Sequence, residues 1–503
     1  MKQTVISKAR GWWKHLLLLC VTLLGVVGIA SAAPNYPFPQ NYQYPNGEIY
    51  TGSDVQTKIQ SLYATWKSKY YTESGNYARV KFIQDGESGT NSVSEGIAYG
   101  MLITVYMDNS TNNTQAMFDK LWNYYKMNMN EHGVMNWKVN AFTGQVTAGN
   151  GNANGATDAD LDAAQALLMA YKQWGDNKYL TDAQTLITNI WNYEVNANKH
   201  LKPGDMFDDY KNPCYFITNA MQLFDDVKSL QGWSNGWNWP AVISNCYSLM
   251  SQTANTSTGL IPDWCYENGN YLNGLIDGKF ESIFGYDASR IPWRLAHAYA
   301  WYGHPQAKTL ASKITTWAKT KYPNPADILD GYYLDGRPGD GQGPFKGSLS
   351  SWGTSSNATF KAGLSVGSMV DASFSNYMSL CWQVGSSNDP YGAYYTHTTQ
   401  LLFMLVLTGN MPNFWDMLPV ATNAETNSDG SVIYVDFSKP MNGTSANTAK
   451  SSFTIKTYAD ESMTSPTTIT VSSASVSSSD SKRVVLNLSS EISDPYIYIS
   501  YNG

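Results

Sequence analysis

The sequence is poor in the groups that bind nucleic acids and metal ions. It holds 33 Lys and Arg against 40 Asp and Glu, a net charge of −7, with no basic stripe, which argues against a nucleic-acid partner. Its 6 histidines lack metal-ligand spacing, and its 5 cysteines lack the close pairs of a zinc site. We therefore expect no metal and no other cofactor. We favour buried free thiols over a disulfide for Cys214, Cys246, Cys265 and Cys381.

Long apolar runs are absent except near the N-terminus. Basic residues at positions 2, 8, 10 and 14 precede an apolar stretch over residues 16–29, and Ala30-Ser31-Ala32 follows it. This order is typical of a secretory signal peptide, and the stretch is too short to predict a membrane span. We expect residues 1–32 to be removed and the remaining protein to be soluble and secreted. Whether it then stays attached to the cell surface is left open.

Aromatic residues are abundant, with 35 Tyr and 17 Trp. Their rings offer a flat apolar face and a polar edge, which suits the flat C–H faces and polar rims of sugar rings. A large helical core that uses many aromatics would explain the same composition.

The pattern from residue 54 to residue 408 is mainly helical. Apolar residues recur at three- and four-residue spacing, as on the buried face of a helix. The predicted helices are 55–70, 93–107, 116–129, 161–174, 183–195, 215–230, 240–250, 290–302, 307–322, 369–382 and 395–407. Long loops over 136–155, 201–213 and 259–286 are typical of functional segments. This order fits a toroid of helical hairpins with a binding cleft built from loops at one end.

The character of the chain changes after Pro412. We expect a catalytic domain over 33–412, a linker over 413–425 and an all-β module over 426–503. Strand-like runs occupy 431–437, 452–456, 467–473, 483–488 and 496–501. The phrase DFSKPMN at 436–442 resembles bacterial immunoglobulin-like modules. Because the chain stops inside a strand-like run, we expect this sandwich module to be truncated and further modules to follow.

Glu95 is the first candidate for chemistry on sugars. Hydrolysis of a glycosidic bond needs a carboxylic acid that protonates the leaving oxygen, and inversion needs a second carboxylate that activates water. Glu95 stands in the apolar phrase SVSEGIAYGML, where Gly96 and Gly100 allow close approach, and such surroundings raise a carboxyl pKa. Ser92 and Glu95 also have the spacing of a capping box, which would be a structural role.

Two other acidic motifs are candidates. Asp158, Asp160 and Asp162 occupy the start of a predicted helix, where acids also interact favourably with the helix dipole. A calcium loop of the EF-hand type is discounted because its later Gly and Glu are missing. Asp287 precedes Arg290 in YDASRIPWR; a neighbouring arginine keeps a carboxylate ionised, as a base requires, although a structural ion pair would look the same.

Together the three motifs resemble glycoside hydrolase family 8. SEGIAYGM, ATDADLDAAQALLMAYKQW and YDASRIPWR occur in this order within a resemblance that spans about 35–412. The supporting phrases are YPFPQN, LKPGD, NPCYF, GLIPDWC and YYTHTTQLL. The resemblance implies an (α/α)6 barrel, an inverting mechanism and a β-linked polysaccharide substrate.

The resemblance also implies roles for five residues. Glu95 matches the general acid, and Asp287 matches the base of the cellulase-containing subfamily. Asp158 matches the aspartate that binds and distorts the central sugar. Arg290 would orient Asp287, and Tyr215 would hold the attacking water.

Aromatic residues that match sugar-stacking positions form a second set. Trp137 and Tyr286 match such positions, and Tyr394 and Tyr395 align more loosely. Phe207 stands where the cellulases often have Trp, and a smaller ring would stack more weakly.

The expected function is therefore that of a secreted inverting endo-β-1,4-glucanase. Mixed-linkage β-glucan, chitosan and xylan remain alternative substrates. Chitosan is kept because Asp205, Asp208 and Asp209 share one predicted cleft loop and could contact its ammonium groups. A non-catalytic carbohydrate-binding or surface protein is the alternative from another class, and retention of all three acids argues against it. A lyase acts on uronic acids and would need a basic cleft, and the sequence shows no sign of one.

Overall fold

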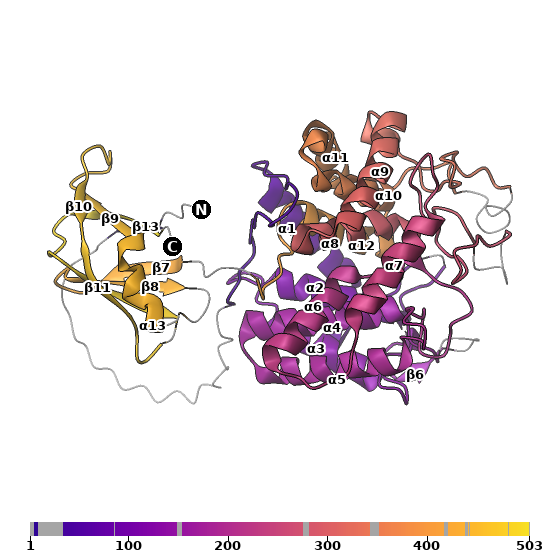
Figure 1. The fold of residues 1–503 in the computed structure, drawn as a ribbon, viewed down its shortest axis with the longest axis horizontal. Helices are drawn as coiled ribbons and strands as arrows, with labels where there is room; N and C mark the ends of the chain where they lie inside the picture. Colours follow the sequence, from indigo (N-terminus) through magenta and orange to yellow (C-terminus); the bar gives the residue numbers. More distant parts are fainter. Residues whose placement is uncertain are drawn as a thin grey trace. The chain divides into compact units, whose positions relative to one another are not determined.

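The computed structural model describes two compact units of the chain. The described residues are 5–8, 34–84, 86–147, 153–274, 281–342, 352–416, 421–437, 441, 443–480 and 482–501. One unit is Ser31–Trp415, and the other is Asp416–Gly503 together with Met1–Ala30; Figure 1 shows a helical and a β unit. Within the described ranges, every helix is too short or too polar to cross a membrane.

A closed inner ring of helices forms the centre of the larger unit. Among the described residues, each inner helix contacts the next one and the last contacts the first. In chain order they are α2 (Ser94–Tyr106), α4 (Thr157–Trp174), α6 (Thr218–Gln231), α8 (Ile291–Tyr302), α10 (Ala358–Val366) and α12 (Tyr394–Leu407). All residues of α12 and all but one of α2 are buried, as expected for helices covered on every side.

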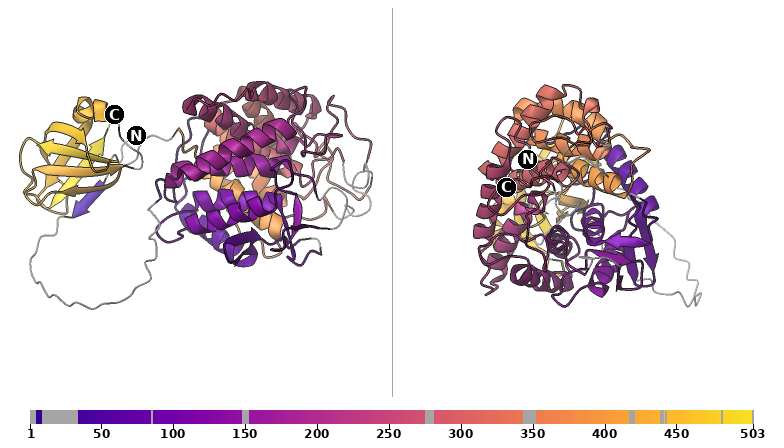
Figure 2. Two further views of the ribbon diagram at one scale, coloured as in Figure 1. Left: turned by 90° about the horizontal axis from the view of Figure 1, so that it is seen from below. Right: turned by 90° about the vertical axis from the view of Figure 1, so that its right-hand side faces the viewer.

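An outer layer of helices covers this ring, and each outer helix packs mainly against one inner helix. The outer helices are α1 (Val55–Tyr70), α3 (Gln115–Met127), α5 (Asn177–Tyr193), α7 (Trp239–Thr253), α9 (Pro305–Lys321) and α11 (Ser375–Gly385). The helices follow the colour order around the ring, and α1 closes onto α12 (Figure 2, right). The predicted (α/α)6 barrel is confirmed.

Two features of the helical unit differ from the sequence prediction. Helix α10 was not predicted, because eight of its nine residues are buried and a fully covered helix lacks an apolar–polar period. Gly363 lets α10 approach the loop before α8, since a Cβ there would lie 2.5 Å or less from the Ser289 carbonyl oxygen. The helix predicted over 369–382 is broken into the 3-10 turns Gly367–Val370 and Ala372–Phe374, followed by α11. The four cysteines among the described residues, Cys214, Cys246, Cys265 and Cys381, are buried and free, as predicted.

Short strands that the helical prediction missed position the start of α2. The strands β2 (Tyr71–Ser74) and β3 (Tyr77–Val80) form a hairpin. A second sheet joins β4 (Asn91–Val93), β5 (Lys138–Asn140) and β6 (Gln145–Val146). Because β4 pairs with β5 and continues directly into α2, the Ser94 amide donates to the Trp137 carbonyl at 2.9 Å. Glu95 and Trp137, 42 positions apart in the numbering, therefore lie beside each other.

The smaller unit is a β-sandwich. One sheet has the order β1-β13-β9-β10 and the other β11-β12-β8-β7. The strands are β1 (Val5–Lys8), β7 (Ala421–Thr426), β8 (Val432–Phe437), β9 (Phe453–Tyr458), β10 (Thr467–Ile469), β11 (Val471–Val476), β12 (Arg483–Leu488) and β13 (Tyr496–Tyr501). Alternate apolar residues such as Ile433, Val435 and Leu486 form its core. A short helix, α13 (Gly443–Ala446), follows β8.

The edges of this sandwich refine the predicted domain limits. Strand β7 begins within the predicted linker 413–425, so the β unit starts earlier than the sequence indicated. The polar residues of β7 do not show the apolar alternation that predicts a strand, and its pairing with β8 is visible only in the structure. Strand β1 pairs with β13 and lies in the predicted signal peptide, so removal of residues 1–32 would take this strand from the sheet.

Candidate active site

Several helices of the inner ring have their N-terminal ends at one cavity of about 250 Å³. Glu95 lies in the first turn of α2, Asp158 in the first turn of α4, and Tyr395 in that of α12. Asp287 and Arg290 immediately precede α8. The cavity is lined by Phe82, Gln84, Val93, Ser94, Glu95, Trp137, Ala156, Asp158, Tyr215, Tyr286, Asp287, Arg290 and Tyr395. Helix N-termini favour negative charge, which suits a site rich in carboxylates.

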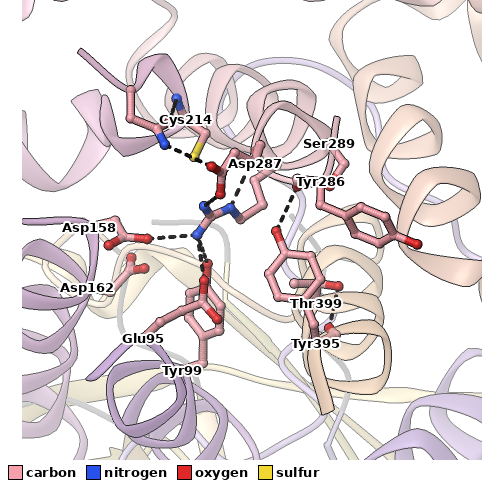
Figure 3. Close-up of polar contacts among 12 residues, drawn as sticks. Glu95, Tyr99, Asp158, Asp162, Cys214, Tyr286, Asp287, Ser289, Tyr395 and Thr399 are labelled. Carbon is pink, nitrogen blue, oxygen red and sulfur yellow. Dashed lines mark hydrogen bonds and ion pairs between the residues drawn. The ribbon is translucent and has the colours of Figure 1, made fainter. Parts of the chain in front are cut away.

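The guanidinium of Arg290 holds three carboxylates together. Its Nη1 donates to Glu95 Oε2 at 2.8 Å and to Asp158 Oδ2 at 2.7 Å, and its Nη2 donates to Asp287 Oδ1 at 2.7 Å. Figure 3 shows these carboxylates converging on one point from separate segments. The arginine is 1% exposed, so its charge acts with little screening by water. The predicted Asp287–Arg290 pair is thus part of a four-residue arrangement.

Glu95 is held in place by a second donor. The hydroxyl of Tyr394 donates to Glu95 Oε1 at 2.9 Å, and Gly96 leaves room for this contact because a Cβ there would lie 2.7 Å from that hydroxyl. Burial raises the pKa of Glu95, and Arg290 opposes the rise. The capping-box alternative fails, since the N-terminus of α2 has no side-chain cap and Ser92 donates to the Val80 carbonyl instead. Glu95 is therefore free to act in the cavity.

Asp287 has a different environment. Its Oδ2 accepts hydrogen bonds from Trp264 Nε1 at 3.0 Å and from Asn212 Nδ2 at 3.2 Å. With Arg290 on Oδ1, hydrogen-bond donors hold both oxygens of this carboxyl group in place. Its side chain is 34% exposed, against 19% for Glu95. Glu95 is thus the drier acid and has a raised pKa, whereas Asp287 is more open to water and is held by three donors. Acid–base catalysis by two carboxyls requires such a difference between their environments.

The three aspartates at the start of α4 have separate partners. Asp158 faces the cavity and Arg290, and burial raises its pKa to about 7. Asp162 forms a double hydrogen bond with Arg294 at 2.9 and 2.6 Å and is fully buried. Asp160 accepts from the Tyr125 hydroxyl. Of the three, only Asp158 lines the cavity. Asp160 and Asp162 have structural roles, although all three lie at the helix end that favours negative charge.

Asp160 belongs to a cluster of buried acids behind the site. Glu194, at the end of α5, is fully buried near Asp160, and burial raises the pKa of both carboxyls, that of Asp160 to about 7. No described lysine or arginine forms an ion pair with either one. Asp205 is also buried, but it accepts from His132 at 2.7 Å and from the Gly155 amide at 2.6 Å. The Asp160–Glu194 pair is therefore best satisfied when it holds a proton.

Replacement of Glu194 by Gln should change how stability depends on pH. The pKa of Asp160 rises from 3.8 in the unfolded chain to about 7 in the folded protein, so the folded state keeps a proton that the unfolded state has released. The free energy of unfolding should then fall as pH rises from about 4 to about 7, by about 1.4 kcal/mol per pH unit and proton. The Gln amide can donate to Asp160, so the slope should be shallower and the variant more stable than the wild type at pH 8.

Urea unfolding at several pH values between 5 and 8 measures this slope. Glu131→Gln, at an exposed acid, is the matched control and should keep the wild-type slope. An unchanged slope for Glu194→Gln would show that the pair does not hold a proton.

The aromatic residues predicted to stack on sugars do not all lie in the cavity. Trp137, Tyr286 and Tyr395 line it. Phe207 lies outside this lining and packs against Tyr210 and Trp264, with ring centroids 6.0 and 6.3 Å apart. Tyr394 requires a correction: it is 1% exposed, so it cannot offer a ring face to a sugar, and its hydroxyl instead holds Glu95.

Several residues of the site carried no role in the sequence interpretation. Phe82 and Gln84 line the cavity, and Asn212 and Trp264 hold Asp287. Asn212 lies in the phrase NPCYF and Trp264 in GLIPDWC. Both motifs are therefore visible in the sequence, but the sequence alone assigns no role to either residue. Within the part of the chain that the structure describes, no group of three or more His, Cys, Asp and Glu is arranged to hold a metal ion.

Comparison with known proteins identifies the same region of the chain. Residues 36–409 match the family described as Glycosyl hydrolases family 8. Endoglucanase 2 of Ruminiclostridium josui is 33% identical over 446 residues, which cover 84% of this chain and 87% of that protein. The Beta-glucanase of Niallia circulans is 30% identical, covering 79% of this chain and 96% of its own.

A solved structure supports the same relationship. The apo structure of a Beta-1,3-1,4-glucanase from Paenibacillus sp. X4 is 30% identical to this chain, with a TM-score of 0.65. The match covers 75% of this chain and 99% of that one. The similarity therefore extends over almost the whole chain of a solved enzyme.

Proposed function

This chain belongs to glycosyl hydrolases family 8, and from that premise we propose that it is a secreted endo-β-1,4-glucanase that inverts the anomeric centre. The observation that carries the proposal is the placement of Glu95 and Asp287 on the two ends of one buried guanidinium. Both acids border a single cavity, and one is drier than the other. The endoglucanase relative supports a glucan substrate.

In the proposed reaction Glu95 is the general acid. Burial raises its pKa, which favours the protonated form at the start of the cycle. Glu95 gives its proton to the glycosidic oxygen as the bond to C1 breaks. Tyr394 and Arg290 keep the carboxyl pointed into the cavity.

Asp287 acts as the general base on the opposite face of the sugar. It removes a proton from a water molecule whose oxygen attacks C1, so the product has the inverted configuration. We expect the two carboxyls to be roughly 6.5–9.5 Å apart to admit this water. Tyr215 lines the same cavity and would hold the water, and Asp158 would bind and distort the central sugar.

Mixed-linkage β-glucan is the second candidate substrate. The Paenibacillus enzyme is named for β-1,3-1,4-glucan and is covered over 99% of its length. Chitosan is less well supported than the sequence alone suggested. Asp205 is buried and accepts hydrogen bonds, and Asp208 is paired with Lys211, so neither is available to a glucosamine ammonium group.

Secretion and the role of the β-sandwich are further parts of the proposal. The basic and apolar N-terminal segments support export through a signal peptide. The sandwich after residue 416 has its own hydrophobic core, which supports an independently folded accessory module of the immunoglobulin-like kind.

Hydrolysis of four polysaccharides with NMR of the fresh product tests this function. Carboxymethyl cellulose and barley β-glucan should be cleaved fast, and chitosan and xylan slowly. The α-anomer should appear first, before mutarotation, because water attacks the face opposite the leaving group of a β-linkage. Cleavage confined to chitosan or xylan would overturn the substrate, and β-anomer appearing first would overturn the mechanism.

A further inference from the structure

Asp263 is a buried acid that the proposed reaction does not use. It is 3% exposed, it does not line the cavity, and no described lysine or arginine forms an ion pair with it. A buried carboxyl without a cation is costly unless hydrogen bonds compensate. The hydrogen bonds that Asp263 accepts therefore stabilise it in this position.

Those hydrogen bonds hold the backbone on both sides of Asp287. Asp263 Oδ1 accepts from the Gly285 amide at 3.0 Å and from the Ala288 amide at 2.6 Å. The two amides bracket the dipeptide Tyr286–Asp287, which supplies a cavity aromatic and the proposed base. One carboxyl oxygen thus fixes the segment on which the base is carried.

Gly285 shows how close this contact is. A Cβ at this position would lie 2.5 Å or less from Asp263 Oδ2, which no side chain could tolerate without displacing the carboxyl. Glycine is therefore required here for the approach of the acid rather than for an unusual backbone angle.

The residue after Asp263 holds the base through its side chain. Trp264 Nε1 donates to Asp287 Oδ2 at 3.0 Å. The backbone of Asp263 and Trp264 also binds the segment that precedes Asp287. The Asp263 amide donates to the Ile283 carbonyl at 2.7 Å, and the Trp264 amide donates to the Glu281 carbonyl at 3.1 Å. Asp263 and Trp264 together fix the backbone and the carboxylate of the base.

We propose that Asp263 is a positioning residue for the reaction, which sets the location of Asp287 by binding the Gly285 and Ala288 amides. The proposal rests on the assigned role of Asp287 as base. It gives Asp263 no contact with substrate, so its loss should affect the chemical step and leave substrate binding intact.

Asp263→Ala should lower kcat on barley β-glucan about 100-fold, the effect of a displacement of about 1 Å in a catalytic group. KM should change by less than about threefold, because Asp263 does not line the cavity and the contacts that bind the substrate remain. Asp263→Asn keeps an oxygen that can accept both amides and should restore kcat to within about tenfold of the wild type. A role in general stability would not produce this split between kcat and KM or this rescue.

Two further variants keep the test decisive. Gly285→Ala displaces the Asp263 carboxyl without removing it and should lower kcat as Asp263→Ala does. This variant therefore tests the proposal even if Asp263→Ala folds poorly. Asp108→Ala is the matched control, because Asp108 is a buried carboxyl that accepts from the Thr114 amide and from Trp174, each at 2.7 Å, beyond the other end of α2. Circular dichroism gives the fraction of Asp108→Ala that is folded, and kcat per folded molecule should equal that of the wild type.

The outcomes separate this inference from the proposed function. Wild-type kcat in folded Asp263→Ala, or no rescue in Asp263→Asn, would overturn the positioning role while Asp287→Ala stayed inactive. Full activity of Asp287→Ala would instead remove the base on which the inference rests.

Discussion

Replacement of Asp287 by Ala is expected to reduce kcat on barley β-glucan by about 10⁴-fold, near the upper end of the effect of a general base. Arg290, Asn212 and Trp264 hold its oxygens at one position, and the other acids on Arg290 are more deeply buried. No neighbouring carboxylate can therefore take its place without a change of backbone. KM should change little, because the loss is in the transition state.

Sodium azide distinguishes loss of the base from loss of the fold. Azide can enter the space left by the carboxylate and attack C1 directly, while Glu95 still protonates the leaving oxygen. Activity of Asp287→Ala should therefore rise with azide and yield an α-glycosyl azide, which NMR identifies. Asp209→Ala, at an exposed acid of a neighbouring loop, should remain close to the wild type without azide. Retention of more than a tenth of wild-type kcat by Asp287→Ala would refute its role as base.

Replacement of Glu95 by Gln is expected to reduce kcat on the polysaccharide by about 10³-fold, because the amide cannot give a proton to the leaving oxygen. The loss should be much smaller on a 2,4-dinitrophenyl β-cellobioside, whose leaving group departs without protonation. Binding of glucan to the variant should be retained, since Gln keeps the size and polarity of Glu. Equal losses on both substrates would argue that Glu95 acts in another way.

The pH profile gives a second measure of the same residue. Burial raises the pKa of Glu95, so the acid is protonated at low pH and loses its proton as pH rises through that value. The alkaline fall of kcat/KM in the wild type should report this loss. Glu95→Gln has no such proton and should lack the alkaline limb on the activated substrate. An unchanged alkaline limb would assign it to a different group.

The site could be predicted in outline because its acids lie in long local motifs. Asp158, Asp160 and Asp162 were visible as a group, and their local pattern could not rank them, since all three occupy the favourable end of a helix. Only the family resemblance singled out Asp158. The tertiary structure ranked them through their partners: Arg290 for Asp158, Tyr125 for Asp160 and Arg294 for Asp162.

The contacts that join distant segments were beyond the sequence. Tyr394 was interpreted as a stacking residue, yet it is buried and donates to Glu95, 299 positions away. Trp264 and Asn212 were noticed only as parts of motifs, and their bonds to Asp287 depend on loops that meet only in the folded chain.

By itself, the sequence determined the helical class of the larger unit, the β class and most strands of the smaller one, and the residues able to carry acid–base chemistry. These follow from local periodicity and from side-chain type. Only the tertiary structure decided which helices form the inner ring, that α10 belongs to it, and that one buried guanidinium binds three carboxylates. The physical reason is that burial and charge pairing depend on neighbours from remote parts of the chain, which set the protonation and position of each acid.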